Sequence, residues 1–463
     1  MRKIYTFTIP RDTFDETQPD KRVIRNLIRK HIAIAQHLHA NMDYYKGKHK
    51  ITTEENRQNK LVCNHAHDIS DTASSYFIGN PIAYTCKEDI TPLTDALELA
   101  GADEADGDNG LELSIYGLAY EYIYMKEGEN DLCIKNLSAE HTFMVKDDSI
   151  EEKELFAVYY YIRKDDSQKE RDHFIATVLT KKFKYELDIE DCDEPQTVDE
   201  IGEEHFLGDI PVIEYLNNKM AIGDFELQIP LIDAYNALMS DRVMDKEQFI
   251  NSILAIYGTL LVDDDKGDGE EDAGIKEFKK RLKQYQILEL PDTAKAEYLT
   301  RTFDETGVEI LKKAIEQDIH KFSHIPCMTD ESFGGNVSGV AMEFKLLGME
   351  DITKIKTRYY RKGLRKRLRI FCNYLSIHQK MNLDPAGITM TFTRALPKNL
   401  LEISQIVSNL WGKVSKKTLL SQIPFVDDVD EELKEVEKET QENIENQQKM
   451  FGNDPNTPPD QPD

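Results

Sequence analysis

Two helical patterns that enclose a short insert place the strongest constraint on how this chain can fold. Phe225 to Ile253 and Asp304 to His324 both carry apolar residues at helical spacing. Between them, Ile256 to Phe303 is predicted to be a small αβ insert around an acidic loop, Asp263 to Asp272. If the two helices pack together, the ends of the insert must lie close to each other. We therefore expect the insert to begin and end at the same end of a helix pair.

A polar, glycine-bearing loop follows the second helix. Pro326 ends that helix, and Gly334, Gly335 and Gly339 permit backbone angles that a β-carbon would forbid. Ser338 is a candidate N-cap for the helix that follows. A flexible polar loop between two rigid helices can present a mobile surface to a large partner. An ordinary connection between helices is the alternative, and the loop alone does not decide between the two.

The long helix predicted for Val340 to Ser376 is strongly basic. Residues 354–369 contain nine cations and no acid. Such a run most often forms a solvated face or a contact between subunits, and a face toward nucleic acid or an acidic neighbour is the alternative. The basic stripe that we single out as inter-subunit or DNA-facing is Lys354, Arg358, Arg361, Arg365 and Arg369.

The rest of the chain predicts a mixed α+β fold. Short β-rich runs separated by charged or polar turns, from about Tyr120 to Ile189, indicate an antiparallel meander. His31 falls on the apolar face of the first predicted helix and is interpreted as a packed core residue. Further helices are predicted at Asp20 to Tyr44, Asn59 to Phe77, Leu111 to Tyr122 (a helix, or a helix that runs into a strand), Leu400 to Gln422 and Val429 to Asn446, before a disordered tail at 453–463.

Composition limits the classes of function. With 463 residues the chain has room for two or three domains. A net charge of −28 argues against a tight, sequence-specific nucleic-acid binder, but it is compatible with a protein past which DNA slides without sticking. Six cysteines without a CxxC pair, and no visible signal peptide, predict free thiols in a reducing cytosol. No apolar run is long enough to span a membrane.

Motifs that would carry chemistry are missing from the sequence. His65, His67 and Asp68 form an H-x-H-D cluster, but residues two apart on a helix point to different faces. The acidic loop fails the EF-hand pattern, and there is no P-loop, GxSxG, HExxH or dinucleotide fingerprint. We expect no catalytic residue, cofactor or metal, and therefore no enzyme. A metal-dependent nucleic-acid enzyme that uses the histidine cluster and a helical scaffold whose acidic C-terminal helix recruits partners remain as alternatives.

Several short segments together point to a known family. They are Y-Y-K-G-K-H-K-I (Tyr44 to Ile51), S-Y-F-I-G-N-P-I-A-Y (Ser75 to Tyr84), I-Y-G-L-A-Y (Ile115 to Tyr120), I-P-V-I-E-Y-L-N-N (Ile210 to Asn218), D-F-E-L-Q-I-P-L-I-D-A-Y-N (Asp224 to Asn236), K-F-S-H-I-P-C-M (Lys321 to Met328) and S-G-V-A-M-E-F-K-L-L (Ser338 to Leu347). In this order and spacing the chain resembles the portal proteins of tailed bacteriophages, in the SPP1-like family of Gram-positive hosts. The resemblance covers roughly residues 20 to 400.

The resemblance implies a non-enzymatic ring, usually dodecameric, at one vertex of the capsid, assembled in the cytoplasm of a host bacterium. It also implies a portal-protein fold with named parts. These are a wing (1–224 and, as a long helix and return, 340–398), two stem helices (225–255 and 304–324), a clip (256–303), a tunnel loop (325–339), a crown (399–448) and a disordered tail (449–463).

The same resemblance assigns roles to residues and partners. The terminase large subunit and a head-completion or adaptor protein would dock on the clip. The other expected partners are further copies of the chain in the ring, double-stranded DNA that passes through it non-specifically, and capsid and scaffolding proteins. No membrane is expected. The acids Asp330 and Glu331 agree with a channel lining that does not hold DNA. The tunnel-loop residues are Thr329, Asp330, Glu331, Ser332, Phe333, Gly334, Gly335, Asn336, Val337 and Ser338, and the expected clip docking surface is Asp263, Asp264, Asp265, Lys279, Lys280 and Lys283.

Overall fold

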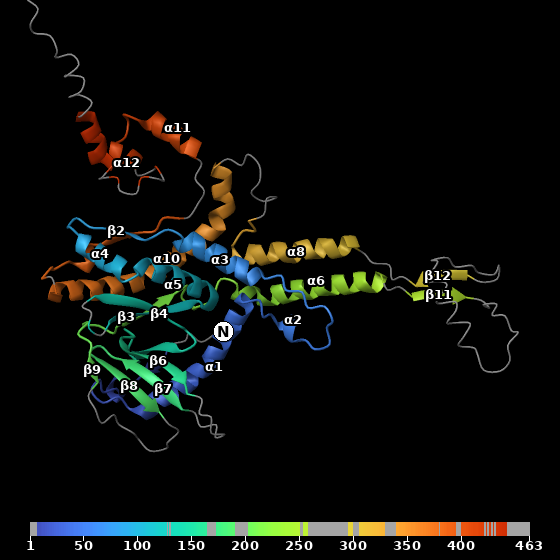
Figure 1. The fold of residues 1–463 in the computed structure, drawn as a ribbon, viewed down its shortest axis with the longest axis horizontal. Helices are drawn as coiled ribbons and strands as arrows, with labels where there is room; N and C mark the ends of the chain where they lie inside the picture. Colours follow the sequence, from blue (N-terminus) through green and yellow to red (C-terminus); the bar gives the residue numbers. More distant parts are fainter. Residues whose placement is uncertain are drawn as a thin grey trace, which may run out of the picture. The chain divides into compact units, whose positions relative to one another are not determined.

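Helices and strands alternate in an α+β arrangement in the computed structural model (Figure 1). The chain divides into two compact units, one of Met1–Cys327 with Gly348–Arg394 and one of Met328–Leu347 with Ala395–Asp463. The structure describes residues 7–126, 128, 131–163, 173–189, 202–250, 253–257, 295–299, 305–328, 339–378, 380–394, 400–420, 423, 426, 429 and 432–441.

The first core of the larger unit lies between helix α1 (Lys21–Tyr45) and a six-stranded sheet. Asp20 begins the helix, because its side chain accepts the N–H of Arg22 at 2.7 Å. The apolar face of α1 places Ile24 and Ile28 against Phe143 and Phe174 of the sheet. The predicted helix is therefore confirmed to within one residue at each end.

Four consecutive strands of this sheet form the predicted antiparallel meander. They are β5 (Thr142–Asp147), β6 (Glu154–Ile162), β7 (Phe174–Leu179) and β8 (Phe183–Ile189). Two edge strands were not predicted: β1 (Phe7–Ile9), which runs parallel to β5, and the short β9 (Glu203–Glu204). A 3-10 turn, η1 (Arg11–Thr13), follows β1.

The first two β-runs do not belong to that meander, and here the prediction was wrong. β3 (Leu118–Met125) and β4 (Leu132–Leu137) pair with β10 (Val212–Leu216) in a separate sheet of order β10-β3-β4. The partner strand β10 lies far along the chain, so local periodicity could not place these strands.

Helices cover the second sheet. Its core joins α3 (His65–Ile78), α4 (Thr91–Leu99), α5 (Ala102–Tyr116) and the long helix α10 (Gly339–His378). α3 begins at His65 rather than at Asn59 because the Asn64 side chain caps it by accepting the N–H of His67 at 3.2 Å. The remaining small elements of this unit are α2 (Lys50–Thr53), η3 (Pro385–Gly387) and an antiparallel pair, β2 (Ala83–Thr85) with β13 (Thr389–Thr391).

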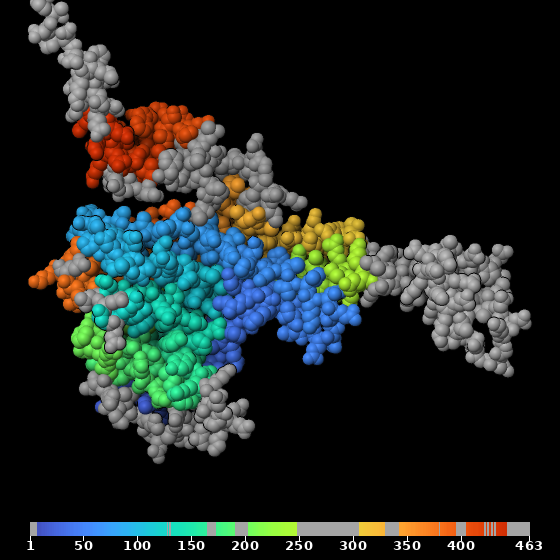
Figure 2. Space-filling view, viewed as in Figure 1, coloured from blue at the N-terminus to red at the C-terminus, as the bar shows by residue number. Residues whose placement is uncertain are grey.

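The predicted helix pair is present. After a 3-10 turn, η2 (Glu226–Gln228), α6 (Ile229–Ile250) runs beside α8 (Glu305–Ser323), as Figure 1 shows. In the space-filling view of Figure 2 the yellow-green surface of α6 lies against the gold surface of α8. Arg242 of α6 binds Glu309 of α8 at 2.8 Å. β11 (Ile253–Tyr257) and β12 (Lys295–Leu299) pair antiparallel where the insert begins and ends, which confirms that its ends lie together. Residues 258–294 and 300–303 of the predicted αβ insert lie outside the described residues.

The smaller unit is helical in its described part. Leu400 to Gln422 was predicted as one helix, but it forms α11 (Leu400–Leu410) and α12 (Lys416–Leu420). Gly412 separates them with a φ of +79°, a left-handed conformation that ends a helix. Residues 432–441 are helical, within the predicted range Val429 to Asn446. Across the described residues, no helix has the length and apolar character that a membrane span requires.

The packed position of His31 is confirmed and predicts a dependence of stability on pH. His31 is 3% exposed, and its Nδ1 lies 2.9 Å from the Tyr160 hydroxyl. Burial, aided by His141, lowers the pKa of His31 to about 3. The unfolded chain therefore binds a proton below about pH 6.5 that the folded chain refuses until about pH 3, so stability falls as pH drops through this window.

We expect the free energy of unfolding to fall by about 1–2 kcal/mol from pH 7 to pH 5 because of this histidine. Urea denaturation of wild type and of His31→Gln at both pH values measures it, because glutamine does not titrate. The matched control is His39→Gln on the same helix, since the side chain of His39 is 58% exposed. An equal decline in wild type and His31→Gln would contradict the assignment.

Candidate functional site on the long helix

The cations of α10 divide into a buried set and an outward set. Lys356 binds Asp224 at 2.6 Å, where the chain enters α6, and both side chains are buried. Lys366 binds Glu154 of β6 and donates to the backbone carbonyl of Val212 at 2.8 Å. These lysines anchor the helix to its own subunit, so they are unavailable to a partner.

Arg367 is the centre of a buried ionic network. Its side chain is fully buried, and it donates from Nε to Glu121 Oε1 at 2.9 Å and from a terminal nitrogen to Asp106 at 2.6 Å. The Tyr360 hydroxyl donates to Asp106 at 2.5 Å, and the Tyr215 hydroxyl donates to Glu121 at 3.1 Å. The network joins α10 to α5 and β3, and it fixes the helix both in rotation and along its axis.

The pKa values of this network follow from burial and from its opposite charges. Burial alone would lower the pKa of Arg367, but the carboxylates of Asp106 and Glu121 outweigh it and raise that pKa well above its usual value. Burial raises the pKa of Asp106, against the attraction of Arg367. The guanidinium is therefore charged at every physiological pH, and it is what allows two carboxylates to be buried side by side.

The predicted basic stripe forms the outward face of the same helix. Its five members recur every three or four residues and so share one side of the helix. Lys354 pairs with Asp351 at 3.4 Å and Arg369 with Asp209 at 3.1 Å. Arg358 and Arg365 are exposed and form no ion pair with any of the described residues. This face, unlike the opposite one, is open to a partner.

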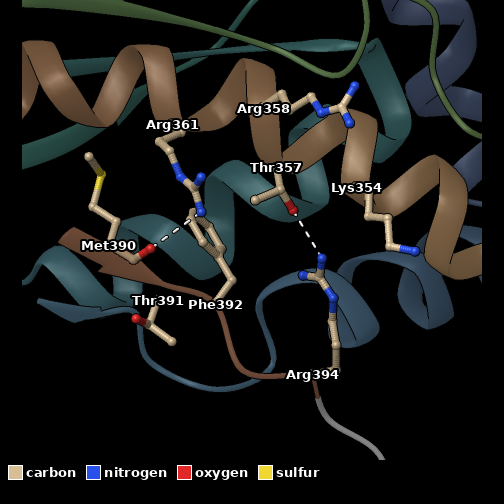
Figure 3. Close-up of a pocket in the computed structure, with 8 residues that line it drawn as sticks. All are labelled: Lys354, Thr357, Arg358, Arg361, Met390, Thr391, Phe392 and Arg394. Carbon is tan, nitrogen blue, oxygen red and sulfur yellow. Dashed lines mark hydrogen bonds between the residues drawn. The ribbon is translucent and has the colours of Figure 1, made fainter.

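A pocket of about 400 Å³ lies between this face and the segment around β13 (Figure 3). We call it the basic pocket. One wall comes from α10 and consists of Lys354, Thr357, Arg358 and Arg361. The other wall is Met390, Thr391, Phe392 and Arg394. Four of these eight residues are cations and none is an acid, so the pocket is built for an anion.

Arg361 and Arg394 are held in fixed positions in this pocket. The guanidinium of Arg361 lies 5.6 Å from the centre of the Phe392 ring and donates to the Met390 carbonyl at 3.3 Å, as Figure 3 shows. Its Nε is buried and has no hydrogen-bond partner among the described residues. Arg394 donates to Thr357 at 3.1 Å and to Glu350 at 3.1 Å. Fixed cations of this kind recognise carboxylates or phosphates with little loss of side-chain entropy.

The other residues singled out in the sequence either lie outside the described residues or are found elsewhere in the fold. The expected tunnel-loop residues 329–338 and the six expected clip docking residues lie outside the described residues. His65 packs against the Tyr235 ring at 4.8 Å, whereas His67 pairs with Asp71 at 3.1 Å, so the H-x-H-D cluster does not converge. Within the described residues no group of three or more metal-type ligands comes together.

Arg394, Phe392 and Met390 were missed by the sequence analysis. They follow α10 in the chain and return beside it through the pairing of β13 with β2. Neither their spacing nor their composition signals this position. An acid-free run on a helix could have suggested that the chain returning beside it completes an anion site, but it does not say which residues do so.

Comparison with known proteins identifies the family. The family model described as "Phage portal protein, SPP1 Gp6-like" matches residues 24–446. The chain belongs to this phage portal protein family. Members of the family are structural components of the phage capsid rather than enzymes. The resemblance seen in the sequence is thereby confirmed.

Relatives of this family member include two curated portal proteins. It is 26% identical over 420 residues to the portal protein of Bacillus phage SPP1, and the aligned region covers 86% of this chain and 79% of the relative. It is 25% identical over 239 residues to the portal protein of Clostridium phage phiCD119, which covers 50% of this chain and 49% of that one.

Two solved structures resemble this portal family member in fold, each with a TM-score of 0.45. One is the neck of an empty GTA particle computed with C6 symmetry, at 11% identity over 77% of this chain and 90% of that chain. The other is the neck of a native GTA particle computed with C12 symmetry, at 10% identity over 78% and 91%.

Proposed function

We propose that this chain assembles into a ring, most simply of twelve copies, at one vertex of a phage capsid. The ring serves as the channel for double-stranded DNA during packaging and ejection. The observation that carries the proposal is the family match across residues 24–446, which spans nearly the whole chain. Assembly takes place in the cytoplasm of the host bacterium, and the finished ring remains in the virion.

We match each proposed part of the ring to elements of the fold. We assign α6 and α8 to the stem and the insert 256–303, which begins and ends at β11 and β12, to the clip. The two sheets and most of α10 form the wing, residues 325–339 the tunnel loop, and residues 399–448 the crown. The antiparallel helix pair supports this assignment, because the chain must pass through the stem once on its way to the clip and once on its way back.

The partners are assigned from the same proposal. The terminase large subunit and a head-completion or adaptor protein dock on the clip, and capsid and scaffolding proteins surround the wing. DNA passes without sequence recognition, in keeping with a net charge of −28 per chain. Hydrolysis of nucleotide belongs to the terminase, since the chain has no P-loop.

Electron microscopy of the purified chain in negative stain tests the ring. We expect a closed ring with an axial hole, and rotational averaging counts its copies. A chain that stays monomeric at high concentration in both low and high salt would overturn the proposal.

The tunnel loop has a separate test. Replacing both Gly334 and Gly335 with valine removes backbone freedom that only glycine offers. We expect the variant to form rings and to reduce packaged DNA by at least about tenfold, a barrier of about 1.4 kcal/mol. Packaging in a complementation assay measures it. The control is Gly107→Val, because Gly107 is exposed in α5 and an added β-carbon there would meet no atom within 4 Å. Normal packaging in the Gly334→Val, Gly335→Val variant would sink the loop assignment.

A further inference from the structure

The basic pocket holds more positive charge than its own chain neutralises. Within the described residues, Glu350 pairs with Arg394 and Asp351 with Lys354 at the edge, but no acid pairs with Arg358 or Arg361. Like charges that lie close together repel one another, and an anion bound between them removes this repulsion. We therefore expect the pocket to bind an anionic group from outside the chain.

The shape of the pocket favours a protruding acidic side chain over duplex DNA. Arg361 is held back against Phe392 and the Met390 carbonyl rather than extended into solvent. Phosphates of a duplex lie on a broad convex surface, which long, protruding cations reach best. A cavity of about 400 Å³ with an aromatic wall instead has room for a few side chains from a narrow turn.

An acidic turn of matching chemistry lies between β5 and β6. At its tip the Ile150 side chain is fully exposed, and Asp148, Glu151 and Glu152 beside it are also exposed. The turn is ordered from within, because the Asp147 carboxylate accepts the N–H groups of Ser149 at 3.3 Å and Lys153 at 2.9 Å. A fully exposed isoleucine among acids on a rigid turn suits a pocket that combines cations with Phe392 and Met390.

The turn and the pocket lie on different sides of α10. Glu154, at the base of the turn, binds Lys366, which is five residues from Arg361. At about 100° per residue, these two side chains leave the helix roughly 140° apart. A ring is built from head-to-tail contacts in which one surface of a copy meets a different surface of the next. Two complementary surfaces on opposite sides of one rigid element meet that requirement.

We propose that the basic pocket binds the acidic turn, residues 148–152, of a second copy of this chain. Asp148, Glu151 or Glu152 supplies the carboxylate to Arg358 and Arg361, and Ile150 contacts the apolar wall. This inference rests on the proposed ring. It gives Lys354, Arg358 and Arg361 of the basic stripe a role in setting the register between subunits, which opposite charges fix more effectively than apolar surface does.

Charge reversal with a matched control tests the contact. The pocket variant is Lys354→Glu with Arg358→Glu. The control is Lys362→Glu with Arg365→Glu, an equal change of charge at exposed positions of the same helix that do not line the pocket. Mass photometry gives the concentration at half assembly. We expect it to rise at least about tenfold in the pocket variant, as losing one good charge pair per interface implies, and less than about twofold in the control.

A reciprocal exchange identifies the partner segment. The turn variant, Asp148→Lys with Glu151→Lys, is expected to weaken assembly as the pocket variant does, and the combination of both variants is expected to restore most of it. Should the pocket variant fail to fold by circular dichroism, the turn variant alone decides, since it must show the same loss. A combination no better than either parent overturns the proposal.

The remaining outcomes separate this inference from the ring itself and from DNA binding. If wild type forms no ring, the proposed function fails. If wild type and the pocket variant form rings equally well, only the present inference fails. If the pocket variant assembles normally but loses binding of a fluorescein-labelled DNA duplex in an anisotropy titration, the pocket belongs to nucleic acid and the proposal is wrong.

Discussion

Replacing Arg367 with methionine is expected to lower the free energy of unfolding by about 3–5 kcal/mol, the usual cost of breaking a buried ion pair by removing one partner. Arg367 is fully buried and is the cation that neutralises Asp106 and Glu121. Methionine fills much of the same space, so the loss comes mainly from two carboxylates left buried without a cation. Urea denaturation followed by circular dichroism measures it.

The pH dependence of this variant distinguishes an electrostatic cause from a packing defect. Without Arg367, the attraction that opposes burial at Asp106 is lost, so the pKa of Asp106 lies further above its unfolded value. The penalty for its buried charge is then absent at low pH and grows as pH rises. We expect the deficit of Arg367→Met to be smaller at pH 5 than at pH 7. A deficit that does not change with pH would contradict the electrostatic explanation.

Two further variants complete this test. Adding Asp106→Asn and Glu121→Gln to Arg367→Met removes the charges that were left behind and should restore part of the stability. Arg365→Met, at an exposed position of the same helix, should stay within about 0.5 kcal/mol of wild type.

The sequence predicts those parts of this fold that depend on local pattern. The helices α1, α6, α8 and α10 are recovered within a few residues because each has apolar residues at helical spacing. The prediction for α5 was wrong at both ends, since it began at Leu111 and ran to Tyr122, whereas the helix is Ala102–Tyr116 and runs into β3. The meander from β5 to β8 is recovered because each strand pairs with the next in the chain.

What the sequence does not predict depends on partners distant in the chain. β3 joins β10 instead of the meander, and β1 pairs parallel with β5 although these two strands are far apart in the chain. The members of the basic stripe share one face of α10, but nothing local shows that Lys356, Lys366 and Arg367 point inward to Asp224, Glu154 and Glu121. The pocket was missed for the same reason, since half of it comes from the segment after α10.

Gly363 gives a second large effect, because it lets α10 approach β10 closely. A β-carbon at this position would lie 2.4 Å from a ring carbon of Tyr215, whose side chain is fully buried and stacks on Tyr360 with ring centres 4.4 Å apart. The ring has nowhere to move without breaking the hydrogen bond of its hydroxyl to Glu121. Gly363→Ala should therefore lower the unfolding free energy by about 1–3 kcal/mol, although alanine favours helix by about 1 kcal/mol over glycine.

The matched control lies fifteen residues earlier in the same helix. A β-carbon at Gly348 would meet only ordinary contacts, the nearest being His324 Nδ1 at 3.4 Å, so Gly348→Ala should leave stability unchanged or raise it by up to about 1 kcal/mol. Because Tyr215 also belongs to the Arg367 network, the losses of Gly363→Ala and Arg367→Met should not add in the double variant. Additive losses, or equal effects at the two glycines, would show that the close approach of the helix to Tyr215 does not hold the network together.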